Sequence, residues 1–147
     1  MTDTRQVTRP GDRLGNVERI FIVEPELHLG PHVVVPDIAG WRRERLTPFP
    51  ETAYITTPPD WLAEVLSPST QAVDRTDKLA VYAEFGVKHC WYVDPIARTL
   101  EVLELTSSAG GSSKWLLAAT FKDADPVTAP PFEVHTFPLD VLWAGDS

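Results

Sequence analysis

Two carboxylates and one lysine occupy positions where they could do chemistry. Asp37 interrupts the nearly all-apolar run 33–39, and Glu64 lies within the apolar segment Trp61–Leu66. A carboxylate in an apolar strand is unfavourable unless it is paired, hydrogen-bonded or bound to a cation. Lys78 lies on the helix expected directly after the Glu64 strand, from which its amine could reach both acids.

These three residues indicate metal-assisted cleavage of a phosphodiester. Asp37 and Glu64 offer hard oxygen ligands to Mg²⁺ (or Mn²⁺ in its place), which accepts one or two carboxylates and keeps several waters. Such a cation polarises the phosphate and lowers the pKa of a bound water. Lys78 would orient that water or neutralise charge in the transition state. The structural alternatives are a turn cap for Asp37 and an exposed ion pair with Asp74 for Lys78.

Three other residues are weaker candidates. Asp74 stands where the helix is expected to begin, so it is expected to be the helix N-cap or to support the site rather than to be catalytic. Arg42 and Arg43 could contact phosphate bidentately, although an arginine-rich surface loop is usually only solvated. Both roles remain open at this stage.

The elements that must position these residues are mostly short strands, since fourteen prolines divide the chain. Apolar spacing predicts one main helix over 74–85, with Gly86 at its C-cap. The expected strands cover 17–23, 33–39, 61–66 and 89–93, with a hairpin formed by 99–105 and 115–121. A short apolar helix or turn over 137–143 should dock on the core. This order predicts an α+β domain around one mixed sheet.

Length and composition fit one soluble domain. The 147 residues are 43% hydrophobic and 23% charged, and we expect a flexible arm over 1–16 followed by a single domain over 17–147. No apolar run approaches the roughly 20 residues of a membrane span. The lack of a secretory signal and the single cysteine favour a reducing cytoplasm.

The charge balance limits how the chain could bind nucleic acid. With 13 Lys and Arg against 21 Asp and Glu, the formal net charge is −8. Proteins that grip duplex phosphates usually carry a surplus of basic residues. Any positive charge that binds DNA must therefore be local, or metal ions must neutralise the acidic residues.

A longer pattern of residues contains these candidates and resembles a known family. The pattern consists of Val35–Asp37, Glu64–Thr70, Asp74, Lys78, Tyr82, Gly86–Val87 and Trp91–Pro95. It resembles the Uma2 family of restriction endonuclease-like proteins, within the PD-(D/E)xK nuclease superfamily, over about residues 20–143. The resemblance implies a restriction-endonuclease-like α/β core. It also implies catalytic positions at Asp37, Glu64 and Lys78, of which the first two bind the metal.

Two features depart from the family's usual pattern. Leu66 stands where the superfamily's E-x-K motif has its lysine, and Lys78 on the following helix would replace it. Only about twenty residues precede Ile20, whereas family members usually carry a longer N-terminal region with a helix and a glutamate. We therefore expect part of that layer to be absent.

Two functional hypotheses follow. The first is a Mg²⁺-dependent endonuclease acting on DNA, with RNA as a substrate that the sequence does not exclude, because phosphate contacts carry no base information. The second is a catalytically inactive nuclease-fold domain that serves as an interaction or oligomerisation module. Exposed sheet edges and the apolar segment 137–143 would also allow a homodimer.

Overall fold

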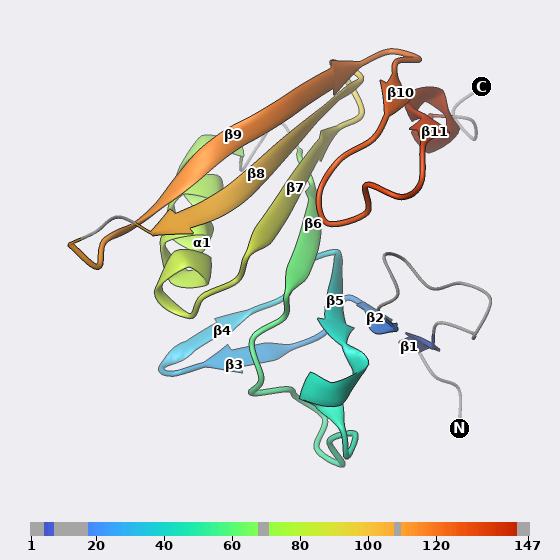
Figure 1. The fold of residues 1–147 in the computed structure, drawn as a ribbon. Coiled ribbons are helices and arrows are strands. Elements are labelled where there is room, and N and C mark those ends of the chain that lie inside the picture. Colours follow the sequence, from blue (N-terminus) through green and yellow to red (C-terminus); the bar gives the residue numbers. More distant parts are fainter. Residues whose placement is uncertain (1–4, 8–17, 68–70, 108–109, 144–147) are drawn as a thin grey trace.

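A mixed β-sheet forms the centre of the molecule. The computed structural model describes residues 5–7, 18–67, 71–107 and 110–143, with the backbone alone for 5–7 and 71–74. Within these ranges, seven strands pair in the order β1-β2-β5-β6-β7-β8-β9 (Figure 1). Their bounds are Arg5–Val7, Arg19–Val23, Ile38–Arg42, Trp61–Val65, His89–Asp94, Thr99–Ser107 and Ser113–Lys122. Strand β1 falls inside the expected N-terminal arm, and the rest of that arm lies outside the described residues.

The connection between β6 and β7 sets the topology. Among the described strands, these two are parallel and every other neighbouring pair is antiparallel. Parallel neighbours need a long crossover, usually a helix, and α1 (Gln71–Glu84) supplies it. The helix ends at Gly86, whose positive φ of 76° suits the residue after a helix. The predicted order of strands, one main helix and a later hairpin is therefore confirmed.

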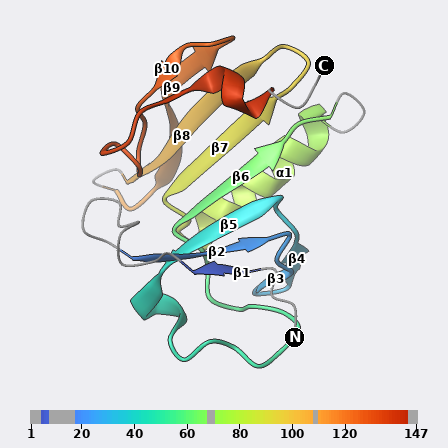
Figure 2. The same ribbon diagram turned by 90° about the vertical axis from the view of Figure 1, so that its right-hand side faces the viewer.

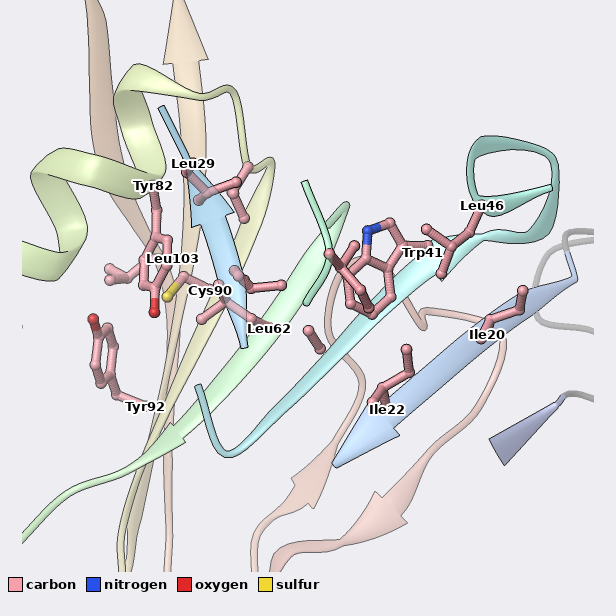
Figure 3. Close-up of a cluster of buried hydrophobic side chains, with 14 residues drawn as sticks. Ile20, Ile22, Leu29, Trp41, Leu46, Leu62, Tyr82, Cys90, Tyr92 and Leu103 are labelled. Atoms are coloured by element: carbon pink, nitrogen blue, oxygen red, sulfur yellow. The ribbon is translucent and has the colours of Figure 1, made fainter. Parts of the chain in front are cut away.

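The two faces of the sheet are covered by different segments. Helix α1 packs on one face, and the chain from β10 (Pro126–Val127) through β11 (Phe137–Pro138) and the 3-10 helix η3 (Leu139–Leu142) covers the other (Figures 1 and 2). We call the cluster under α1 the helix-side core; it includes Ile22, Leu62, Tyr82, Cys90, Tyr92 and Leu103 (Figure 3). The opposite cluster, the aromatic-side core, includes Trp61, Ala63, Trp91, Leu100, Leu139 and Trp143. Leu139 and Trp143 belong to this core, so the predicted docking of 137–143 is confirmed.

The expected buried strand over 33–39 is wrong. The run divides into β4 (His32–Val34), which pairs with β3 (Leu27–Leu29) in a separate small sheet, and β5 in the central sheet. Val33 and Val35 are largely exposed. Proline cannot donate to a ladder, and Pro36 lies in the break between the two strands. Asp37 therefore directly precedes a strand instead of interrupting one.

Gly40 allows the aromatic packing beside β5. A Cβ at this position would lie 2.8 Å from Phe21 Cε1 and 3.3 Å from Trp61 Cε3. The Phe21 and Trp61 rings meet edge-on above it, with centroids 5.8 Å apart. Close packing therefore requires glycine at position 40, because a methyl group there would displace the two rings.

Candidate active site

Glu64 is a buried carboxylate on the helix side of the sheet. Side chains alternate between the two faces along a strand, so β6 sends Trp61 and Ala63 into the aromatic-side core and Leu62 into the helix-side core. Glu64 follows the same alternation onto the helix side, and it is only 6% exposed. Burial at that level requires compensating partners for the charge.

Two residues of α1 provide such partners. Tyr82 donates a hydrogen bond from Oη to Glu64 Oε2 at 2.8 Å, and Lys78 Nζ lies 3.6 Å from the same oxygen. Residues four apart on a helix share a face, which is why both reach one carboxylate. Burial, followed by the nearby Glu64 charge, raises the pKa of Tyr82 well above its usual range, so the phenol remains a donor.

Asp37 directly precedes the neighbouring strand β5, at the same end of the sheet as Glu64. Its Oδ2 accepts a hydrogen bond from the backbone N–H of Val65 at 2.6 Å. Ile38 is paired with Ala63 in the antiparallel register of β5 and β6, so Asp37 stands one step further along, opposite Glu64. Directly opposed residues have Cβ atoms about 5 Å apart. The structure therefore brings Asp37, Glu64 and Lys78 to one region.

The donor set at this position suits a hard divalent cation. Mg²⁺ takes one or two carboxylates and keeps several waters, and Asp37 and Glu64 offer oxygens from adjacent strands. No group of three or more His, Cys, Asp or Glu side chains with metal-binding geometry occurs within the described residues.

A second polar layer continues across the same face. The strand register places Tyr92 of β7 beside Glu64 and Glu101 of β8 beside Tyr92. Arg75 of α1 forms an ion pair with Glu101, and its Cζ lies 4.2 Å from the centroid of the Tyr92 ring. The Tyr92 hydroxyl is buried and has no nitrogen or oxygen partner. Burial, followed by the neighbouring Cys90 thiol, raises the pKa of Tyr92 well above its usual range.

The arginine candidates lie at the other end of β5. Arg42 is the last residue of the strand that begins one residue after Asp37, which corresponds to about 16 Å of strand length. Arg42 Nε lies 3.4 Å from Glu44 Oε2, and Arg43 Nε lies 3.6 Å from Glu18 Oε2. The structure thus does not bring these arginines to the carboxylates, and their contact with phosphate stays a prediction.

The expected role of Asp74 as a helix N-cap is wrong. Helix α1 begins at Gln71, three residues earlier than the sequence suggested, so Asp74 lies inside the helix and not at its boundary. The Asp74 side chain is outside the part of the structure that is described. Whether it pairs with Lys78 or supports the site therefore stays a prediction.

Sequence reasoning about chemistry missed two contributors. Tyr82 entered only as part of the family pattern, although its spacing of four residues from Lys78 was a readable sign of a shared helix face. The Val65 amide that holds Asp37 could not be found in this way, because it depends on the pairing of β5 with β6.

Comparisons with known proteins show the family and the fold. The sequence matches the Uma2 family, described as "Putative restriction endonuclease", over residues 4–141. No curated protein matches the chain. One similar solved structure is described as a putative nuclease belonging to DUF820, from Anabaena variabilis. It has a TM-score of 0.63 and 21% identity, and the match covers 86% of this chain and 68% of that one. At this identity the likeness shows the fold, which is that of a nuclease-like α+β protein.

No helix among the described residues is long and apolar enough to cross a membrane. The family match extends over nearly the whole sequence and includes every candidate catalytic residue. The chain therefore belongs to the Uma2 family of putative restriction endonucleases.

Proposed function

We propose that this protein is a Mg²⁺-dependent endonuclease that hydrolyses phosphodiester bonds in DNA. Asp37 and Glu64 are the cation ligands, and Lys78 is the assisting amine. One observation carries the proposal. Two groups of α1 converge on a single oxygen of a buried glutamate, while an aspartate from the adjacent strand is fixed at the same end of the sheet.

Each residue has a separate task in this proposal. Tyr82 holds Glu64 through Oε2, so the carboxylate keeps one orientation. The Val65 amide does the same for Asp37. A bound divalent cation would supply polarisation of the phosphate and a water of lowered pKa. Preorganised ligands matter because small displacements of reacting groups cost large factors in rate.

Lys78 is suited to meet a substrate. Its side chain is 25% exposed, compared with 8% for the Glu64 side chain, so the ammonium lies between the buried carboxylate and solvent. From that position Nζ can donate to a non-bridging phosphate oxygen as negative charge grows there. The same charge offsets the repulsion between an acidic protein and its polyanionic substrate.

The choice of DNA depends on the family and not on contacts in this chain. The matched family is described as "Putative restriction endonuclease", and restriction endonucleases cut DNA. The formal net charge of −8 predicts few phosphate contacts and therefore weak salt dependence of binding. RNA cleavage is the competing outcome that the assay below distinguishes.

A second candidate is an inactive nuclease-fold module that binds a partner protein. The observation in its favour is that Lys78 Nζ lies 3.6 Å from Glu64 Oε2, so the buried carboxylate already has a counter-charge without a metal ion. Under this hypothesis Lys78 simply neutralises Glu64, and the pair is structural.

A cleavage assay separates these functions. Supercoiled plasmid, single-stranded DNA and RNA are incubated with the protein and Mg²⁺ or Mn²⁺, and EDTA serves as the blank. We expect metal-dependent DNA cleavage that Lys78→Ala lowers about 10²-fold. Lys88→Ala is the matched control, because it removes an equal charge from an exposed residue after α1. Equal rates for Lys78→Ala and wild type would contradict the catalytic role, and Mn²⁺ binding without cleavage would favour the inactive module.

A further inference from the structure

Unpartnered buried polar atoms are uncommon, and one of them lies beside the candidate site. Among the described side chains, the buried nitrogen and oxygen atoms without a hydrogen-bond partner are Arg43 Nε, Trp61 Nε1, His89 Nδ1 and Tyr92 Oη. Trp61 belongs to the aromatic-side core, and His89 is its partner in the strand register. Of these four residues, only Tyr92 belongs to the helix-side core, which also contains Tyr82, the hydrogen-bond donor to Glu64.

The position of Tyr92 relative to Glu64 follows from the sheet. The two residues are directly paired in the parallel register of β6 and β7, so their side chains extend from adjacent strands toward α1. Tyr92 is 2% exposed, and the Arg75 guanidinium covers its ring. Figure 3 shows the Tyr82 ring extending away from the helix and the Tyr92 ring on the same side of the sheet.

The two tyrosines differ in what their hydroxyls do. Tyr82 Oη already donates to Glu64, whereas Tyr92 Oη has no nitrogen or oxygen partner and interacts with the Cys90 thiol. The Cys90 thiol is a weak donor and a weak acceptor, so it satisfies the Tyr92 hydroxyl only in part. A buried hydroxyl without a partner is unfavourable in the folded protein, and a ligand that supplies a partner recovers that free energy.

We propose that Tyr92 is a positioning residue whose hydroxyl gains an oxygen hydrogen-bond partner only when a divalent cation is bound at Glu64. A water molecule carried by the cation would donate its hydrogen to Tyr92 Oη, since Mg²⁺ and Mn²⁺ keep part of their hydration shell and a phenol accepts as well as donates. One bridging water spans two polar groups at little cost in free energy. This inference rests on the proposed metal site and adds a residue to it.

Tyr92→Phe tests the inference because it removes one oxygen and little else. Thermal unfolding is measured without metal, and Mn²⁺ affinity is measured by calorimetry, for wild type, Tyr92→Phe, Tyr82→Phe and Glu64→Gln. Without metal, Tyr92→Phe is expected to melt at or above the wild-type temperature, whereas Tyr82→Phe melts lower because it loses an existing bond. With Mn²⁺, Tyr92→Phe is expected to weaken binding about two- to tenfold.

Each remaining outcome identifies what fails. If Tyr92→Phe melts below wild type or does not fold, the hydroxyl already has a partner and the inference is overturned. If Glu64→Gln abolishes Mn²⁺ binding and Tyr92→Phe binds like wild type, the inference alone is overturned. If wild type binds no Mn²⁺, or Glu64→Gln binds it equally well, the metal site and this inference fall together.

Discussion

The two faces of β6 show opposite solutions to burial. On one face, Trp61 meets Trp91 and Phe132 edge-on, with ring centroids 5.2–5.6 Å apart. On the other face, three residues further along the same strand, Glu64 carries a buried charge held by Tyr82 and Lys78. The aromatic face gains free energy from burial and edge-to-face contacts. The helix face holds a group that costs free energy to bury.

This difference suggests a division of labour across one sheet. The aromatic-side core contributes to stability alone, whereas the helix-side core combines apolar packing with an arrangement that is unfavourable unless it has a function. Active sites commonly reduce stability in this way. The comparison predicts that substitutions on the two faces separate stability from activity.

The largest effect is expected from the aromatic face. Trp91→Ala removes a side chain that is 7% exposed and whose Nε1 donates to Pro130 O at 2.9 Å. We expect it to lower the free energy of unfolding by about 3–5 kcal/mol, measured by urea unfolding, while the folded fraction keeps its cleavage rate. Trp91→Phe is the control and should lose less. A lower cleavage rate per folded Trp91→Ala molecule would argue against this separation of stability from activity.

Glu64→Gln is expected to have the reverse effect. The amide keeps an acceptor for Tyr82 and removes the buried charge, so the melting temperature should stay the same or rise, whereas cleavage should fall about 10²–10³-fold. Glu104→Gln on β8, whose side chain is 36% exposed, is the matched control and should cleave normally. A Glu64→Gln variant that is destabilised but cleaves at the wild-type rate would show that Glu64 is a structural residue.

Gly40→Ala should have a smaller effect, confined to stability. The added Cβ would lie 2.8 Å from Phe21 Cε1, so the ring must shift and part of its contact with Trp61 is lost. Overpacking of this kind costs about 1–3 kcal/mol, which chemical unfolding can resolve. Combining it with Phe21→Leu should recover part of the loss, and no recovery would mean that the backbone, and not the ring, is strained.

The smallest expected effect concerns His89. Burial is the largest cause of its lowered pKa, ahead of the opposing influence of Glu104. His89 therefore binds a proton less readily in the folded protein than in the unfolded chain, where its pKa is about 6.5. The free energy of unfolding falls as the pH drops below that value. The slope is at most about 1.4 kcal/mol per pH unit. His89→Gln should flatten the pH dependence of unfolding between pH 7.5 and 5.5, and parallel curves would contradict this account.

The local elements of the site could be predicted from the sequence. The apolar segment around Glu64 and the helical spacing around Lys78 define β6 and α1 within a few residues, because each depends on neighbours in the chain. The split of 33–39 into β4 and β5 could not be predicted so directly. A short apolar run does not tell which of its residues pair, and the exposure of Val33 and Val35 depends on distant segments.

The contacts that hold the candidate site together are non-local. The Val65 amide reaches Asp37 across β5 and β6, and Tyr92 stands beside Glu64 only because β7 returns parallel to β6. No periodicity in the sequence encodes that register. The carboxylates could therefore be nominated in advance, but not the groups that hold them.

Calorimetric titration of Mn²⁺ into wild type, Asp37→Asn, Glu64→Gln and the double variant tests the central claim most directly. If the two carboxylates hold one cation together, wild type shows saturable binding, each single variant loses most of it, and the double variant is little worse than either. Binding that is unchanged in both single variants would contradict a shared metal site between β5 and β6.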